Sequence, residues 1–389
     1  MIEKYYSGVI EQIYNRIGKE TRNIVMANYS NDFSIENLEV IRRYQSNEDN
    51  VFFAYSEFSY NTLIGAYEPF LDIICNMHRR FIGGSFDDFQ KECGVYYLHR
   101  QVLNSYYETG ECFREETVLL NEVAYERRRM TMAIADMLKR LSEVRPLMIV
   151  INRFQMASKS SIETIKYLID NPCASIGIVL GVNALVKGTD STVEVWDRIV
   201  ESLEDRSAIY YIGSAGSLKN NVKTTNDDEL YITMNFEQSI QEASNIMEFL
   251  DFEQAKRGCR IIEHKLKFED AWIDEKSLRR FYMVYARTSV LLGEMSKAIE
   301  LTNEYKALIP KNDSEHYLSL YYFMKGTCYM YQGKLEKAEN CAKSAYDYAV
   351  LAEDDTLIFK AELLSVMIKM SGWYNIFFCV QDIPVSDEL

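Results

Sequence analysis

The chain has 389 residues, of which 48% are hydrophobic and 26% are charged, and its formal net charge at pH 7 is -15. Such a composition is typical of a globular protein, and the length allows two or three domains, each with its own core. The negative charge argues against nucleic acid and against a membrane surface as the main partner, because both attract basic patches.

Short apolar runs alternate with helical stretches in the first half of the chain. The apolar runs are residues 23–27, 51–58, 147–151, 176–182 and 208–213. Runs of this kind are typical of strands that are buried on both faces of a parallel sheet. Between two of them, residues 115–144 repeat apolar side chains at the spacing of one helix face. The alternation predicts an α/β domain over residues 1–215, a parallel sheet with helices on both faces.

The composition changes after residue 215. Residues 216–232 are mostly polar and lack periodicity, so we expect a linker there. The segment that follows, residues 233–389, shows helical patterns throughout, which predicts an all-α region.

An internal repeat runs through this second region. Gly293 and Gly333 lie forty residues apart, and each separates two helical stretches of which the second carries a small residue near its start. A helix, a glycine turn and a closely packed second helix form a tetratricopeptide-type hairpin. A weaker third copy follows, with Gly372 as its turn, and residues 243–266 resemble one more hairpin. We therefore expect a short tetratricopeptide-like solenoid, with an irregular helical bundle as the alternative.

Residues 27–34 have the length and the flanks of a phosphate-binding loop between a strand and a helix. Such a loop reads G-x-x-x-x-G-K-[ST]: backbone N–H groups and the lysine hold the phosphates, and the hydroxyl holds magnesium. Here the glycine positions hold Ala27 and Asp32, the lysine position holds Phe33, and Ser34 keeps the expected type. A carboxylate at this place repels a triphosphate, and the positive charge of the lysine is missing.

A second nucleotide motif requires acidic residues at the end of a buried strand, where they hold the magnesium. The strand predicted over residues 147–151 is followed by Asn152 and Arg153 instead. An amide lacks the charge that anchors a divalent cation, so hydrolysis is not expected. ATP or ADP with magnesium is disfavoured as a ligand, and we predict no bound cofactor.

The order of these segments resembles the STAND signalling ATPases, and more narrowly the bacterial AAA-type group that includes the regulator of the maltose operon. The resemblance covers nearly the whole chain and is strongest over residues 62–75 and 147–183. It implies a P-loop nucleotide-binding switch domain coupled to a repeat sensor arm. On this resemblance Ser34 matches the magnesium-binding hydroxyl, Asn152 replaces the metal-holding acid, and Asn183 lies near the sensor position.

The cysteines and histidines indicate neither a metal site nor a catalytic triad. Eight cysteines are scattered without a C-x-x-C pair, and the four histidines are isolated from one another. Such a pattern indicates reduced thiols. The sequence also lacks an apolar stretch of membrane-spanning or signal-peptide length, so we expect a cytoplasmic protein.

These features together predict a pseudo-ATPase, a signalling or scaffold protein that binds a protein or peptide through its repeats. Its degenerate and empty nucleotide site would consist of Ala27, Asn31, Asp32, Phe33, Ser34, Asn152 and Arg153. Aromatic residues on the repeats are candidate partner contacts, although core packing would also explain them: Tyr282, Tyr285, Tyr322 and Tyr329.

Two other interpretations stay open. The first is an ATP-dependent regulatory switch in which uncharged residues such as Ser30 and Asn31 replace the usual charged groups. The second is a subunit of a hetero-complex whose partner is an active ATPase or a regulator. Neither interpretation involves nucleic acid or a membrane.

Overall fold

The computed structural model describes most of the chain in two compact units. The described residues are 2–19, 23–28, 38–46, 51–58, 63–112, 122–183, 186–187, 209–212, 223–224, 235–268, 273–312 and 314–381. The first unit comprises residues 1–269 and the second residues 270–389, and each is described by itself.

The first unit contains the strands and most of the helices. Its strands are β1 (Asn23–Asn28), β2 (Phe52–Glu57), β3 (Leu147–Asn152), β4 (Ile176–Asn183), β5 (Val186–Lys187), β6 (Ile209–Ile212) and β7 (Lys223–Thr224). Its α-helices are α1 (Ile2–Tyr14), α2 (Glu39–Ser46), α3 (Phe70–Met77), α4 (Phe86–Glu92), α5 (Tyr97–Thr109), α6 (Val123–Val144), α7 (Lys159–Asp170), α9 (Phe236–Glu248) and α10 (Phe252–Phe268). A π-helical turn, His78–Ile82, follows α3, and a 3-10 turn, Phe154–Met156, follows β3.

Five parallel strands form the main sheet in the order β2-β3-β4-β1-β6. The prediction of a parallel α/β sheet is therefore confirmed. All six residues of β3 are buried, as its uninterrupted apolar sequence requires in the middle of a covered sheet. Strand β2 lies at the edge of the sheet and is half-buried. Strands β5 and β7 pair separately.

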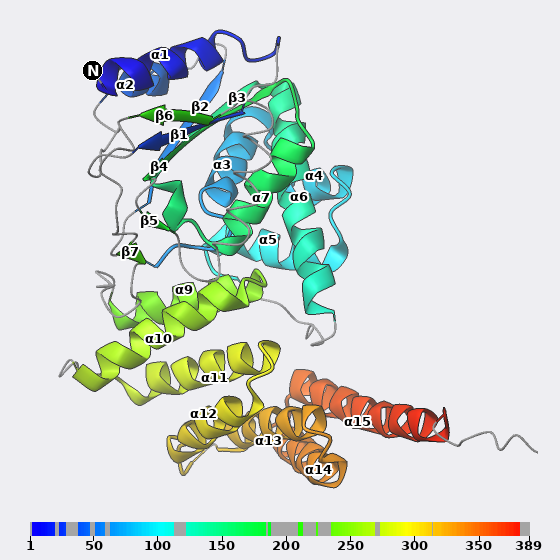
Figure 1. Cartoon of the computed structure of the whole chain (residues 1–389). Helices are drawn as coiled ribbons and strands as arrows, with labels where there is room; N and C mark the ends of the chain where they lie inside the picture. The colour runs from blue at the N-terminus through cyan, green and yellow to red at the C-terminus, as the bar shows by residue number, and fades with distance from the viewer. Residues whose placement is uncertain are drawn as a thin grey trace, which may run out of the picture. The chain divides into compact units, whose positions relative to one another are not determined.

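Helices cover both faces of this sheet. Helices α1 and α2 lie on one side, and α3, α6 and α7 lie on the other (Figure 1). Alternate strand residues point to opposite faces, so Met148, Val150 and Val179 pack with apolar side chains of α1 and α2. Gly177 allows α1 to approach β4 closely, because a Cβ at this position would lie 2.9 Å from Cγ2 of Ile13.

The hairpin of α9 and α10 is part of the first compact unit, although its sequence resembles a repeat. The predicted domain limits at residues 215 and 233 thus differ from the division at residue 269. Contacts between distant segments explain the difference. The Asn245 amide donates to the carbonyl of Gly110 at 3.0 Å, and the Gln254 amide donates to that of Ile64 at 2.9 Å.

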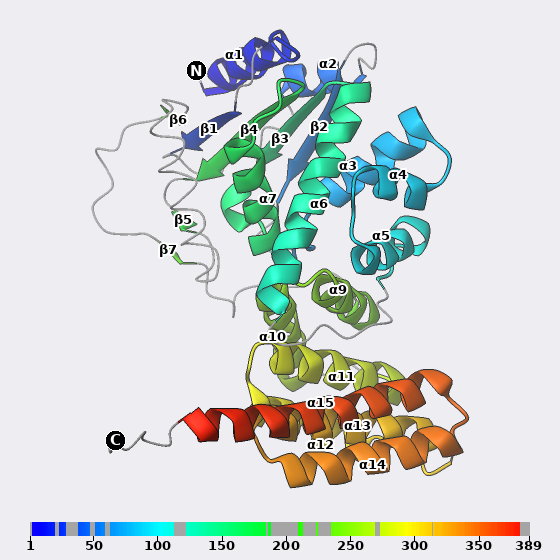
Figure 2. The same cartoon turned by 90° about the vertical axis from the view of Figure 1, so that its right-hand side faces the viewer.

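The second unit consists of paired helices, α11 (Glu275–Leu291), α12 (Met295–Ala307), α13 (Glu315–Tyr331), α14 (Leu335–Leu351) and α15 (Asp355–Gln381). Helices α11, α13 and α15 begin forty residues apart, which confirms an all-helical region of hairpins with the predicted period. Figure 2 shows α15 alongside α13 and α14. Among the helices described here, none has the length and apolar character needed to cross a membrane.

Two of the predicted glycine turns have the same geometry. Gly293 has a φ of 78° and Gly333 a φ of 71°. In both turns the following amide donates to the carbonyl five residues earlier, at 2.8 Å from Glu294 to Ser289 and at 2.9 Å from Lys334 to Tyr329. This is the left-handed helix end that glycine accommodates without steric cost.

The prediction of a third turn, at Gly372, is wrong. Helix α15 continues through this residue to Gln381. The forty-residue period that places the turns at Gly293 and Gly333 places the next one at Trp373. A bulky residue disfavours a positive φ, whereas a right-handed helix accommodates it. The chain therefore lacks the signal that reverses it in the first two hairpins.

Replacement of Gly333 by alanine is expected to lower the free energy of unfolding by about 1 kcal/mol, because an L-residue is strained in this conformation. Urea denaturation followed by far-UV circular dichroism measures the change. The matched control is Gly8→Ala in α1, where an added Cβ has no neighbour within 4 Å. It should preserve or raise stability, since alanine favours helix. Equal effects of the two substitutions would contradict a turn constraint at Gly333.

Candidate functional site

Ligands of open parallel sheets bind outside the carboxyl ends of the strands, at the point where the strand order reverses. Strand β1 lies at this point of the main sheet, between β4 and β6. Its residue Ala27 pairs with Val182, and Asn28 pairs with Asn183. The loop residues Asn31, Asp32, Phe33 and Ser34 lie outside the described part of the chain. Their roles in a nucleotide site stay a prediction.

At the end of β3, Asn152 is buried against the neighbouring strand. A Cβ on Gly181 of β4 would lie 2.5 Å from its Oδ1 atom, so the amide fills the space that a side chain at position 181 would need. Asn152 is 4% exposed. The amide therefore packs on the backbone of β4, and a side chain at position 181 would force it to shift.

Arg153 follows in a left-handed conformation, with a φ of 54°. Its Nη1 atom lies 3.3 Å from Oε1 of Glu57, at the end of β2, and donates to the carbonyl of Phe58 at 3.5 Å. The hydroxyl of Tyr55 donates to the same carboxylate. The parallel register of β2 and β3 sets Glu57 level with Asn152. The guanidinium that follows β3 is thus paired with groups at the end of β2.

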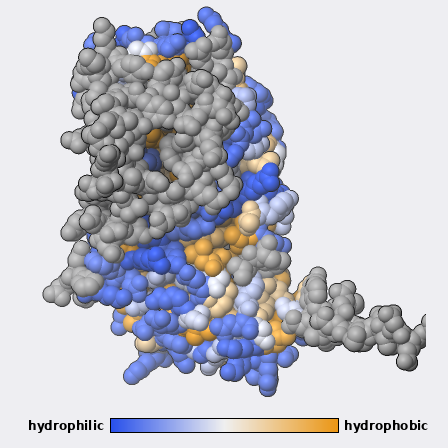
Figure 3. All heavy atoms as spheres, viewed as in Figure 1, coloured by the Kyte–Doolittle hydropathy of each residue, from blue (hydrophilic) through white to orange (hydrophobic). Residues whose placement is uncertain are grey.

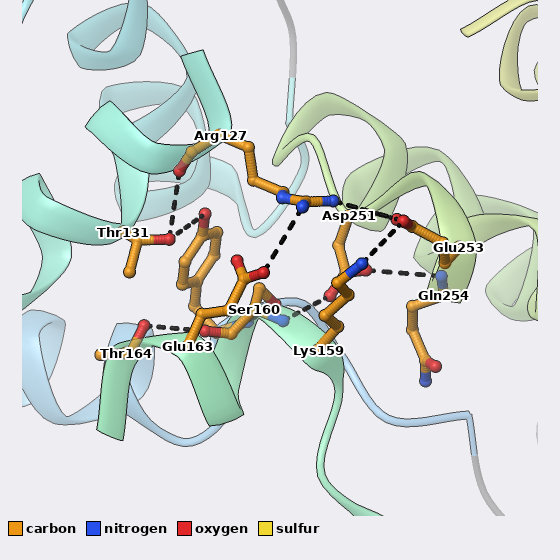
Figure 4. Close-up of polar contacts among 10 residues, drawn as sticks. Arg127, Thr131, Lys159, Ser160, Glu163, Thr164, Asp251, Glu253 and Gln254 are labelled. Carbon is orange, nitrogen blue, oxygen red and sulfur yellow. Dashed lines mark hydrogen bonds and ion pairs between the residues drawn. The ribbon is translucent and has the colours of Figure 1, made fainter. Parts of the chain in front are cut away.

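A second group of polar side chains, which we call the interhelix cluster, joins α6, α7 and the start of α10 (Figure 4). Arg127 of α6 lies 3.4 Å from Glu163 of α7 and 3.2 Å from Glu253 of α10. Lys159, the first residue of α7, lies 3.0 Å from Glu253. These side chains are about one-fifth exposed. Two cations and two carboxylates of the cluster therefore connect three helices, and the charges of these four side chains balance.

Asp251 is the most deeply buried member of the interhelix cluster, with no exposed surface. Its carboxylate accepts a hydrogen bond from the amide of Ser160 in the first turn of α7 at 2.9 Å, and one from the amide of Gln254 in α10 at 3.4 Å. Both helices present the positive end of their dipole to it. Burial raises the pKa of Asp251, and the hydrogen bonds from Ser160 oppose this rise. One carboxylate thus caps two helices.

The turn before α10 holds Asp251 in place through a strained residue. Leu250 has a φ of 67°, a conformation that costs a bulky residue about 1 kcal/mol. On the other side, the Oγ atom of Ser160 accepts from the amide of Tyr67 at 3.0 Å. The Tyr67 hydroxyl lies 3.4 Å from Oγ1 of Thr131 in α6. The first turn of α7 is therefore the point where four segments meet.

An acidic cavity of about 270 Å³ lies beside the same hairpin. It is lined by Leu63, Gly65, Ala66, Glu68, Leu71, Asp72, Tyr106, Glu242, Asn245, Ile246 and Phe249. A Cβ on Gly65 would lie 2.9 Å from Oε1 of Glu242 and 3.3 Å from Oε2 of Glu68. The hydroxyl of Tyr106 donates to Asp72 at 3.3 Å. Three carboxyl groups thus converge on one small space.

Burial and the nearby Glu68 and Asp72 raise the pKa of Glu242 to about 7. Burial also raises the pKa of Glu68, although the amide of Gly65 donates to it at 2.8 Å. Ionisation of both carboxyl groups is unfavourable, because the two charges would repel each other in a poorly solvated cavity. In the described ranges there is no group of three His, Cys, Asp or Glu side chains arranged to hold a metal ion. Glu242 therefore keeps its proton to a higher pH than an exposed glutamate does.

The four predicted contact tyrosines are mostly engaged within the second unit. Tyr285 is buried, with 3% of its surface exposed, as the alternative of core packing expected. Tyr322 is half-buried and stacks on Tyr348 of α14 with ring centres 5.7 Å apart. Tyr329 is half-buried beside the α13–α14 core, and Tyr282 packs against Phe281. Core packing explains these rings, as the alternative interpretation expected.

Sequence reasoning missed both the interhelix cluster and the acidic cavity. A signal for half of the cluster exists, because Asp251 and Ser158 each precede a helix and are typical N-cap residues. The pairing of Asp251 with α7 has no sequence signal. The same holds for Glu68 and Glu242, which are far apart in the chain.

Comparison of the chain with protein-family models, curated proteins and solved structures finds no match.

Replacement of Asp251 by alanine is expected to lower the free energy of unfolding of the first unit by about 3 kcal/mol, because α10 loses its cap and the buried Ser160 amide in α7 loses its acceptor. The control is Asn235→Ala, since Asn235 is exposed and caps only α9, through Gln238 at 2.9 Å. It should cost about 1 kcal/mol. Chemical denaturation measures both, and an Asp251 variant as stable as the wild type would contradict the bridging role.

The acidic cavity predicts a pH dependence that Glu242→Gln should remove. The folded protein holds the Glu242 proton with a pKa of about 7, above its ordinary value of 4.5. Proton binding by Glu242 therefore contributes fully to the free energy of unfolding below the ordinary pKa, and this contribution is lost as the pH rises through 7. Relative to the variant, the free energy of unfolding of the wild type should fall by about 2 kcal/mol between pH 5 and pH 8. Denaturation at several pH values measures this loss, and parallel curves for the two proteins would contradict it.

Proposed function

We propose that the chain is a catalytically inactive member of the P-loop signalling ATPase type, a scaffold that binds a protein partner through its helical repeats. The observation that carries this proposal is the structure at the end of β3. Asn152 packs on the backbone of β4 at Gly181, and Arg153 pairs with Glu57 at 3.3 Å. A magnesium nucleotide requires carboxylates at this place.

The arrangement of the sheet supports the α/β part of the proposal. The parallel strands and their covering helices persist, and the carboxyl end of β1 lies beside that of β4, where a nucleotide would bind. The polar residues at the predicted nucleotide site differ from those of an active P-loop ATPase, while the strands around the site are apolar as in such a fold. A fold that keeps its core without its ligand chemistry fits a structural role.

The helical region supports the interaction part. Hairpins at a constant period, each closed by a glycine turn, stack their helices side by side. Ala298 and Ala338, at equivalent positions after the two turns, are fully buried. Tetratricopeptide-like arrays of this kind present extended surfaces to proteins or peptides. A hetero-complex with an active ATPase or a regulator is compatible with this role.

Isothermal titration of the full chain with ATP or ADP in the presence of magnesium is expected to show no binding, and a phosphate-release assay no turnover. A double variant, Asp32→Gly with Phe33→Lys, supplies the glycine and the lysine of a phosphate loop. It should gain at least about tenfold in ATP affinity, because an aspartate is removed and a counter-charge added.

Micromolar ATP binding with turnover by the wild type would contradict the proposal and favour an ATP-dependent switch. Failure of the double variant to gain affinity would instead show that residues 27–34 are not a former phosphate loop.

A further inference from the structure

Helix α15 exposes a row of apolar side chains, which we call the α15 outer face. It consists of Phe359, Leu363, Val366 and Met370, whose exposed fractions are 60%, 38%, 52% and 55%. Spacings of four, three and four residues place them on one side of the helix. The opposite side, which includes Leu364 and Ile368, is buried in the core shared with α13 and α14. Apolar patches interrupt the hydrophilic surface of the helical region in Figure 3.

The equivalent face of α13, one period earlier, is covered by the second helix of its own hairpin. Its residues are Ser319, Phe323, Gly326 and Met330. The Ser319 hydroxyl donates to the carbonyl of Ala345 in α14 at 2.9 Å. A Cβ on Gly326 would lie 3.1 Å from Cβ of Cys341. Met330 shares a core with Ala338 and Ala342. In this hairpin the face is an interface between helices.

No helix of the described chain takes this place on α15. By the forty-residue period, the returning helix would begin at Asn375, the equivalent of Leu335. Residues 375–381 belong to α15 itself, because the helix does not turn at Trp373. The face that is an interface in the preceding hairpin is therefore open on α15.

We propose that the α15 outer face binds an amphipathic helix of a partner protein, in the way that α14 covers the equivalent face of α13; this inference rests on the scaffold function proposed above. The expected partner helix carries small residues at intervals of four and three. Helix α14 meets α13 with such a row, Ala338, Ala342 and Ala345, all fully buried. Large residues on one helix pack best against small ones on the other.

The same complementarity argues against two other occupants. A second copy of α15 would set Phe359, Leu363 and Val366 against the same large side chains. The chain itself has Phe378, Asp382 and Val385 one period after the three alanines of α14. These are large or charged, and a proline at position 384 opposes a helix there. A partner helix with a row of small residues fits the face better than either.

The test uses a fluorescein-labelled peptide of residues 334–352 of this chain, the helix that covers α13, with Cys341→Ala to prevent oxidation. Its anisotropy is followed on titration with the full chain. We expect saturable, micromolar binding that Val366→Glu weakens at least about tenfold, because a carboxylate would be buried in an apolar interface. A peptide with leucine in place of the three alanines should lose as much. Val366 is half exposed, so melting should be unchanged.

The control is Tyr125→Glu, which changes an apolar residue of α6 that is 63% exposed and should not affect binding. Absence of saturable binding would overturn the inference, as would equal binding by Val366→Glu. A dimer of the wild type in light scattering that Val366→Glu dissociates would identify a second copy as the occupant. A tenfold gain on deletion of residues 382–389 would identify these residues as the occupant. Either result would overturn the inference.

The nucleotide titration does not involve α15, so its outcome is independent of peptide binding. A protein partner that binds the wild type and Val366→Glu equally would keep the scaffold function and reject the α15 outer face.

Discussion

A carboxylate without solvent contact must be satisfied by the protein that surrounds it, and this constraint organises the first unit. Asp251 has no exposed surface and accepts from the amides of Ser160 and Gln254. Each amide belongs to the start of a helix, where backbone donors lack partners within the helix. Capping thus joins α7, which covers the sheet, to α10, which belongs to a helical hairpin. The charge balance of Arg127 and Lys159 with Glu163 and Glu253 surrounds this junction.

The junction at Asp251 also determines the extent of the first unit and the position of its buried charges. It ties a repeat-like hairpin to the α/β core, so that the first unit extends to residue 269. It also brings Glu242 against Glu68, and none of the described residues that line this cavity is a lysine or an arginine. The site at the end of β3 is neutralised in another way, through Arg153 and Glu57. The charged side chains of the first unit thus hold its segments together, which is consistent with the proposed scaffold. The α15 outer face of the second unit is the proposed surface for a partner.

Sequence patterns indicated the features that depend on neighbouring residues. The apolar run of β3 and the turns at Gly293 and Gly333 follow from burial and from backbone conformation, which are local properties. Gly372 misled because a glycine permits a turn without requiring one, and the exact period falls on Trp373. The pairs Asp251 with Ser160 and Glu242 with Glu68 arise when distant segments pack together, so no local pattern indicates them. The ion pair of Arg153 and Glu57 likewise depends on the register of β2 and β3.

Native-state hydrogen exchange of the Ser160 and Gln254 amides tests the central claim most directly. If Asp251 joins the hairpin to the sheet, both amides exchange only on unfolding of the whole first unit, with the same protection free energy as the amides of β3. If α10 detaches from α7 in a local opening, both amides will exchange with a protection free energy several kcal/mol below that of β3. That result would contradict a single cooperative unit built around Asp251.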